Sequence, residues 1–128
     1  METLGRPMSI RTPQEVLEDH LAQVVEGTVE RDLARNHAED VRLLTAEAVL
    51  CGHDGVRQCE RALRDRVPEV RFAIVTKRLD GECAFIEWTA EGRGVRVLDG
   101  VETFIIQDGL IRTRTVHYTV QLVRGAER

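Results

Sequence analysis

The apolar residues near the start of the chain recur at the spacing of one helix face. Between positions 13 and 26 they lie one, three or four residues apart, which predicts an amphipathic α-helix that buries Val16, Leu17, Leu21, Val24 and Val25. Thr12, Pro13 and Glu15 have the pattern of a capping box with proline at the first helical position. Gly27 is placed to end the helix. His20 falls on the apolar face.

The same spacing predicts two more helices. The first is short, and the residues expected on its inner face recur every four positions, at Val29, Leu33 and His37. The second carries an apolar stripe formed by Val56, Cys59, Leu63 and Val67. Apolar runs at 41–45 and 48–51 predict two short strands between these helices. Residues 52–55 predict a turn into the last helix, with Asp54 as its N-cap.

From position 69 onward the pattern alternates, which is typical of strands. Turns are predicted at Asp80-Gly81, at 92–94 and at Asp108-Gly109, and they separate four runs at 70–77, 82–91, 96–107 and 110–123. In the second run one face consists of Ala84, Ile86, Trp88 and Ala90. Asp99-Gly100 interrupts the third run and is interpreted as a bulge that bends the strand.

This order of elements predicts an α+β fold. Three helices, with a short strand pair before the third, precede a four-stranded antiparallel meander. The helices are expected to pack on one face of a strongly curved antiparallel sheet. A sheet bent around a helix leaves an open end lined by side chains, so the fold is expected to be cone-shaped and to contain a pocket.

Composition and charge narrow the class of protein. The chain has 128 residues, 42% of them hydrophobic and 31% charged, which fits one globular domain at 12–128 after a flexible arm at 1–11. A net charge of −4 without a basic cluster argues against a nucleic-acid partner. Neither a membrane-spanning run nor a secretion signal is recognised, so a cytoplasmic location is expected.

The three cysteines of the sequence form no C-x-x-C pair. Cys51, Cys59 and Cys83 are spread along the chain. They are interpreted as small buried apolar residues of a reducing compartment rather than as disulfides or zinc ligands.

Several local motifs, in this order, resemble the SnoaL-like proteins of the nuclear transport factor 2-like superfamily. The motifs are EVLEDHL at 15–21, AEDVRLL at 38–44, GHDGV at 52–56, FIEW at 85–88 and FIIQDGLI at 104–111. The resemblance covers about residues 12 to 123 and implies a cone-shaped, cystatin-like domain with an apolar pocket. Relatives are usually homodimers through the outer face of the sheet. They include polyketide cyclases, ketosteroid isomerase, limonene epoxide hydrolase and scytalone dehydratase, besides binding and assembly modules without chemistry.

Two histidines are the candidate catalytic residues, because histidine titrates nearest to neutral pH. His20 lies where the resemblance implies a donor on the first helix, although a core histidine bonded to a backbone carbonyl gives the same pattern. His117 lies on the last strand beside Thr113, Thr115 and Thr119, on a face too polar for a plain core. That face either lines the pocket, in the region where polyketide cyclases keep an acid/base carboxylate, or is the solvated or dimer-facing side of the sheet.

The remaining candidates are expected to line the pocket. Trp88 has small neighbours and suits stacking on a flat, largely apolar ligand, although a core role is equally compatible. The other predicted lining residues are Thr115, Phe104, Leu44, Glu102 and His53, the last at the pocket rim. His37 is assigned no role. No pair of histidines has the i, i+4 spacing of a metal site, so neither a metal nor a cofactor is expected.

The functional hypothesis is a domain that binds a small apolar or polycyclic organic molecule. If it is an enzyme, isomerase, cyclase or hydrolase chemistry by proton transfer without a cofactor is expected. The alternative is a non-catalytic ligand-binding or dimeric interaction module.

Overall fold

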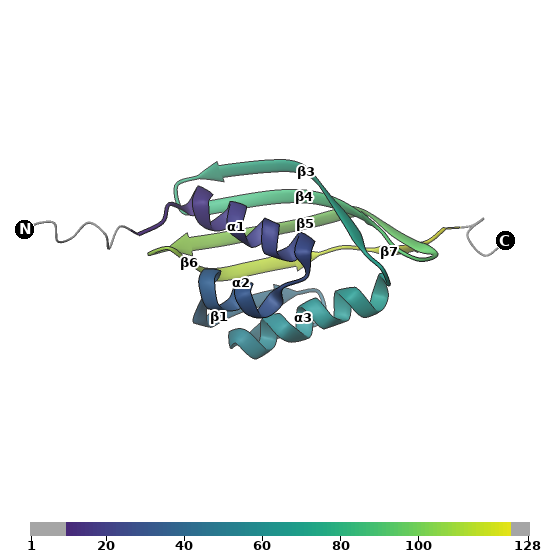
Figure 1. Cartoon of the computed structure of the whole chain (residues 1–128), viewed down its shortest axis with the longest axis horizontal. Helices are drawn as coiled ribbons and strands as arrows, with labels where there is room; N and C mark the ends of the chain where they lie inside the picture. Colours follow the sequence, from purple (N-terminus) through teal and green to yellow (C-terminus); the bar gives the residue numbers. More distant parts are fainter. Residues whose placement is uncertain (1–9, 124–128) are drawn as a thin grey trace, which may run out of the picture.

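The computed structural model describes residues 10–123, and Figure 1 shows its helices lying across one face of a bent sheet. The elements in chain order are α1 (Pro13–Glu26), α2 (Val29–Asn36), β1 (His37–Thr45), β2 (Val49–Cys51), α3 (Gly52–Arg66), β3 (Arg71–Asp80), β4 (Cys83–Glu91), β5 (Val95–Gln107), β6 (Leu110–His117) and β7 (Val120–Leu122). The predicted α+β class is confirmed.

The first helix has the predicted bounds and the predicted cap. The backbone N–H of Glu15 donates to Thr12 Oγ1 at 3.1 Å, and the N–H of Thr12 donates to Glu15 Oε1 at 2.8 Å. Gly27 ends the helix with a left-handed φ of 76°. His20 is buried in the same face as Val16 and Leu17. The expected arm lies mostly outside the described residues, but Arg11 donates to Asn36 Oδ1 at 2.9 Å.

Two helix boundaries differ from the prediction. Helix α2 ends at Asn36, and His37 is the first residue of β1. Helix α3 begins at Gly52 with Cys51 as its cap residue, so the predicted turn at 52–55 is the first turn of the helix. A Cβ on Gly55 would lie 2.9 Å from Cβ of Leu50. This glycine therefore permits close packing of α3 on β2 and does not mark a turn.

The sheet has the strand order β2-β1-β6-β5-β4-β3, and β7 pairs with β5. Strands β3 to β6 form the predicted antiparallel meander. However, β1 lies parallel to β6, so the whole sheet is mixed and not antiparallel throughout. The parallel pair is possible because α3 and the meander separate the two strands in the sequence.

The bulge predicted at Asp99-Gly100 is present. Trp88 pairs with Gly100 and Ala90 pairs with Val97, so β5 has one extra residue against β4 at this point. A Cβ on Gly100 would lie 2.3 Å from the Trp88 ring, so the indole lies directly on the glycine. The bulge therefore bends the sheet and also makes room for its only tryptophan.

The last run of the sequence is shorter as a strand than the pattern predicts. Asp108 and Gly109 have φ of 54° and 76°, as in the predicted hairpin turn. Strand β6 then ends at His117, and β7 resumes at Val120. In the gap, the N–H of Thr119 donates to Asp99 Oδ1 at 2.8 Å. The two short strands pair with different parts of the bent β5, which explains the interruption.

The core lies between the helices and the sheet. All four residues of the predicted inner face of β4 are buried: Ala84, Ile86, Trp88 and Ala90. The cysteine prediction is partly wrong: no disulfide is present among the described residues, but Cys51 and Cys83 are exposed and Cys59 is half-buried. Within the described part of the chain, the helices are too short or too polar to cross a membrane.

Candidate functional site

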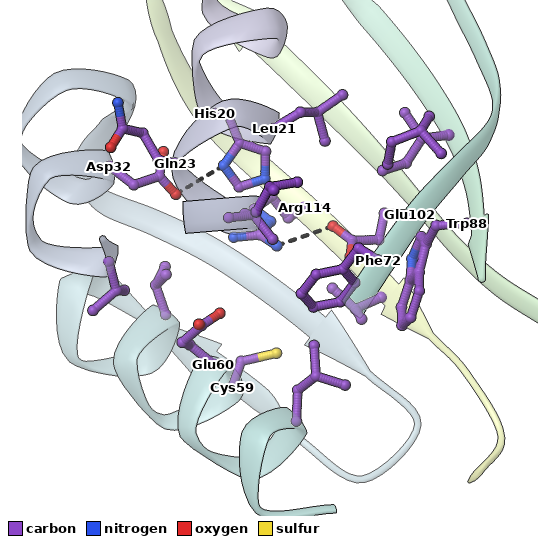
Figure 2. Close-up of a pocket in the computed structure, with 18 of the residues that line it drawn as sticks. His20, Leu21, Gln23, Asp32, Cys59, Glu60, Phe72, Trp88, Glu102 and Arg114 are labelled. Carbon is purple, nitrogen blue, oxygen red and sulfur yellow. Dashed lines mark hydrogen bonds and ion pairs between the residues drawn. The ribbon is translucent and has the colours of Figure 1, made fainter. Parts of the chain in front are cut away.

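A mainly apolar cavity lies between the three helices and the inner face of the sheet (Figure 2). Its apolar wall includes Leu21, Val56, Leu63, Phe72, Ile86 and Trp88, and its polar side chains include His20, Asp32, Glu102 and Arg114. The free volume inside the cavity is about 40 Å³. This volume holds about three water molecules. A polycyclic ligand of the predicted kind would require side chains of the wall to move.

A buried hydrogen-bonded pair joins α1 to α2 at one end of this cavity. His20 Nδ1 lies 2.8 Å from Asp32 Oδ2, and the two side chains are 2% and 4% exposed. The other carboxylate oxygen of Asp32 accepts a hydrogen bond from Asn36 Nδ2 at 2.8 Å. Burial by itself raises the pKa of Asp32, but His20, His37 and Asn36 together lower it to about 2. The charged carboxylate therefore holds the Nδ1–H of His20, and Nε2 is left for the cavity.

A second buried group connects His37, the first residue of β1, to β6 and β5. Arg114 NH1 donates to His37 Nε2 at 3.1 Å, and Arg114 NH2 donates to Glu102 Oε1 at 2.9 Å. Burial, followed by the positive charges of Arg114 and His20, lowers the pKa of His37 to about 3. His37 is therefore neutral near pH 7, with Nδ1–H facing the Asp32 carbonyl oxygen at 3.4 Å. The only guanidinium of this group is balanced by Glu102.

The far side of the cavity is aromatic. The ring centroids of Phe72 and Tyr118 lie 5.6 and 5.5 Å from that of Trp88. The indole Nε1 of Trp88 is buried and has no hydrogen-bond partner among the described residues. The Nε of Arg114 is likewise buried and has no hydrogen-bond partner among the described residues. The cavity thus combines an anchored imidazole at one end with buried, unused donors elsewhere.

The structure brings together only some of the predicted site residues. His20, Trp88 and Glu102 line the cavity. Phe104 is buried against His20, with ring centroids 5.4 Å apart, and the Arg114 guanidinium lies 5.6 Å from the centroid of the Phe104 ring. His53 is at the start of α3, where its Nε2 lies 3.1 Å from the carbonyl oxygen of His37, and it is not part of the cavity wall.

His117, Thr115 and Leu44 do not lie in this cavity. Val116 faces the cavity, and alternation along β6 turns Thr115 to the outer face of the sheet. There Thr115 Oγ1 lies 2.5 Å from Thr103 Oγ1. His117 is exposed at the end of β6, where it lines a separate hollow between the sheet and α3, together with Arg66 and Tyr118. Leu44 pairs with Thr115 and is 42% exposed. Of the two interpretations of the threonine-rich face, the structure matches the outer side of the sheet for Thr115, whereas His117 lines the separate hollow.

Three residues of the site are not expected from the sequence. Asp32 has the pattern of one more charge on a polar helix, and His37 has no predicted role. Arg114 lies in a polar run, yet it has the same strand parity as Val116 and Tyr118. The even spacing from Val116 and Tyr118 is the signal in the sequence that Arg114 faces the cavity, because strand residues two positions apart lie on the same face.

One cluster also has the geometry of a metal site. Among residues 10–123, His20, Asp32 and His37 each offer one ligand atom, and these atoms lie within 4.8 Å of one another. The sequence contains no such signal, because the cluster forms only when α1, α2 and β1 meet. The same atoms already form hydrogen bonds, and the Arg114 guanidinium beside His37 opposes a divalent cation. The arrangement therefore suits a proton better than a metal ion.

The lowered pKa of His37 predicts acid destabilisation of the fold. In the unfolded chain this imidazole takes up a proton near pH 6.5, but in the folded chain only near pH 3. Protons therefore favour unfolding. As the pH decreases from about 6.5 to about 3, the free energy of unfolding should decrease by up to about 1.4 kcal/mol per pH unit. Asp32, whose pKa is lowered to about 2, adds to the loss only below its unfolded value of 3.8.

Urea unfolding between pH 7 and pH 4 measures this slope. The His37→Gln variant should show a shallower slope, because glutamine can face Asp32 and Arg114 without titrating. The matched control is His117→Gln, which replaces an exposed histidine and should retain the wild-type slope. A wild-type slope in His37→Gln would contradict the assignment.

Comparisons with known proteins show which family the chain belongs to. The chain is similar to the structure of a provisionally named ketosteroid isomerase from Kribbella flavida, with 17% identity and a TM-score of 0.71 over 84% of this chain and 77% of that one. It is also similar to the epoxide hydrolase/cyclase-like enzyme SalBIII, named for a role in pyran ring formation in the polyether salinomycin. That match has 16% identity and a TM-score of 0.71 over 87% and 95% of the two chains.

A provisionally named polyketide cyclase from Sinorhizobium meliloti has 15% identity and a TM-score of 0.69 over 80% of this chain and 93% of that one. These identities show a shared fold, of the nuclear transport factor 2-like type, and no more. No curated protein matches the chain. The model of the SnoaL-like domain matches residues 17–114, and the chain therefore belongs to the SnoaL-like family.

Proposed function

We propose that the chain binds a small, mainly apolar organic molecule in the cavity and transfers a proton to or from it through His20. One observation carries the proposal: the Nδ1 of His20 lies 2.8 Å from the buried carboxylate of Asp32, while His20 itself forms part of an apolar cavity wall. A histidine that only fills the core would need no charged partner. The chemistry would be that of a cofactor-independent isomerase, cyclase or hydrolase.

The proposed roles follow from the charges around His20. When Nε2 accepts a proton, the ring becomes positive, and the Asp32 carboxylate at Nδ1 stabilises that charge. The apolar wall keeps water away, so this electrostatic stabilisation is stronger than it would be in solvent. The Arg114–Glu102 pair contributes a fixed guanidinium to the same cavity. Similarity to proteins named as an isomerase and as cyclases is consistent with such chemistry.

Hydrogen–deuterium exchange tests this proposal with simple model ketones in place of the natural substrate. A panel of small cyclic ketones is incubated with the protein in D2O, and loss of the α-proton signal is followed by NMR. The wild-type protein should accelerate exchange of at least one ketone. His20→Gln should lower that rate by about 100-fold or more, because general-base catalysis contributes factors of about 10²–10⁴. Asp32→Asn should lower it as well.

His117→Gln is the matched control, because it removes an exposed histidine that does not line the cavity of His20. It should exchange the ketone at the wild-type rate. A folded His20→Gln variant as active as the wild type would reject His20 as the base, and loss in His117→Gln alone would transfer the role to His117. If a ligand stabilises the protein thermally but no ketone exchanges, the alternative of a non-catalytic binding module is favoured.

We also propose that the chain forms a homodimer through the outer face of the sheet. Strand pairing places Phe85, Thr103, Thr115 and Leu44 in one row across β4, β5, β6 and β1. Leu44 at the end of this row is 42% exposed. These four side chains are apolar or uncharged, and a row of this kind suits contact with a second copy.

The oligomeric state of a charged variant tests the dimer. Leu44→Glu introduces a carboxylate into the row and should convert a dimer to a monomer in light scattering, because an unpaired charge in an interface is costly. Val75→Glu is the control, since Val75 is 63% exposed at a bulge of β3 and pairs with no residue of the row. A monomeric wild-type protein, or a dimeric Leu44→Glu variant, would contradict the proposed interface.

A further inference from the structure

The indole N–H of Trp88 is a buried donor without a partner. The residue is 3% exposed, and Nε1 makes no hydrogen bond to any described residue. Buried polar groups are nearly always paired, because an unpaired one loses its bond to water and gains nothing in return. Trp88 also forms part of the cavity wall. An unpaired donor at such a place is explained when a ligand supplies the acceptor.

The indole is held in its position by the surrounding structure. Its ring lies on Gly100, where a Cβ would come within 2.3 Å of it. Phe72 and Tyr118 pack beside it, with ring centroids 5.6 and 5.5 Å away. The ring therefore cannot rotate freely to bring Nε1 to solvent. Figure 2 shows Trp88 on the opposite side of the drawn pocket from the His20–Asp32 pair.

The remaining polar groups of the cavity define the chemistry of the missing acceptor. Arg114 Nε is a second buried donor without a partner among the described residues, while the other nitrogens of this guanidinium are taken by His37 and Glu102. Both unsatisfied atoms are thus donors. The charged groups that line the cavity are three carboxylates, on Asp32, Glu60 and Glu102, against the single guanidinium of Arg114. A further anion would add to an excess of negative charge, so a neutral oxygen acceptor fits best.

We infer that Trp88 is a specificity-determining residue whose Nε1–H donates a hydrogen bond to the oxygen of a neutral carbonyl compound. The inference rests on the proposed function, because it names the substrate class of the same cavity. The carbonyl oxygen lies at the Trp88 end, and the carbon next to the carbonyl is turned toward His20. A ketone oriented in this way presents its α-proton to the imidazole, and Trp88 stabilises the oxygen as it becomes more negative.

The single tryptophan of the sequence provides a direct readout. The ¹H–¹⁵N spectrum of the protein contains one indole signal, which belongs to Trp88. Cyclohexanone and methylenecyclohexane serve as probes, because they have nearly the same shape and only the first carries an acceptor oxygen. Cyclohexanone should shift the indole proton downfield in a saturable manner. Methylenecyclohexane should leave that proton without a downfield shift, although it perturbs backbone amides around the cavity.

The Trp88→Phe variant keeps an aromatic ring and removes the N–H. Backbone amide shifts should show that its Kd for cyclohexanone rises by about 5- to 10-fold, as expected for one lost hydrogen bond. Its Kd for methylenecyclohexane should stay within about twofold of the wild-type value, which shows that the variant is folded and its cavity intact. An indole proton unmoved by the ketone, or moved equally by both probes, would overturn the inference. So would an unchanged ratio of the two Kd values in Trp88→Phe.

The His20→Gln variant separates this inference from the proposed catalysis. If Trp88 is the donor, the ketone-induced indole shift persists in His20→Gln even though α-proton exchange is lost. If the catalytic proposal fails and no ketone exchanges in the wild-type protein, the selective indole shift still supports Trp88 as the donor. Exchange that is fast in the wild type and undiminished in Trp88→Phe, without a selective indole shift, rejects the inference and leaves the role of His20 intact.

Discussion

The buried carboxylate of Asp32 is the interaction on which the rest of the site depends. It contacts His20 of α1, accepts from Asn36 of its own helix, and has His37 at the start of β1 close by. A carboxylate with 4% of its side chain exposed is unfavourable unless it is paired and hydrogen-bonded. Here these partners come from three elements, so the charge requires α1, α2 and β1 to meet in one arrangement. Removing one partner of such a pair costs about 3–5 kcal/mol.

The opposite end of the cavity is shaped by the curvature of the sheet. The extra residue of β5 bends it against β4, and Gly100 leaves the space that the indole of Trp88 occupies. Arg114 lies between the two ends and reaches His37 on one side and Glu102 on the other. The helices thus supply the charged anchor, while the sheet supplies an aromatic wall and unused donors. A cavity with unlike ends can orient a ligand, which a uniformly apolar cavity cannot do.

The sequence predicts the fold better than it predicts the site, for a physical reason. Helical and alternating periods report which face of an element is buried, and they locate α1, the inner face of β4 and the hairpin turn at Asp108 correctly. They identify His20 and Trp88 because both lie on apolar faces. They do not report which elements meet, so the pairing of His20 with Asp32 is not visible in them. The parallel contact of β1 with β6 is another long-range feature without a local signal.

The position of His117 shows a further limit of local patterns. Its face is too polar for a plain core, as the sequence indicates, but polarity alone does not distinguish a pocket wall from the outer side of a sheet. The parity of Val116 turns Thr115 to the outer side, while His117, the last residue of β6, lines a separate hollow with residues of α3. Arg114 escapes prediction for the converse reason: a charged residue at a core position looks like a surface residue until its partners Glu102 and His37 are known.

The proposed chemistry requires that Asp32 hold His20 with its Nδ1 protonated and its Nε2 open to the cavity. Nitrogen-15 NMR of the histidine side chains, at a pH where the ring of His20 is neutral, measures this most directly. We expect the proton on Nδ1, an Nε2 with the chemical shift of an unprotonated acceptor, and a weaker preference in Asp32→Asn. A proton found on Nε2 of His20 in the wild-type protein would contradict the proposed role of the pair.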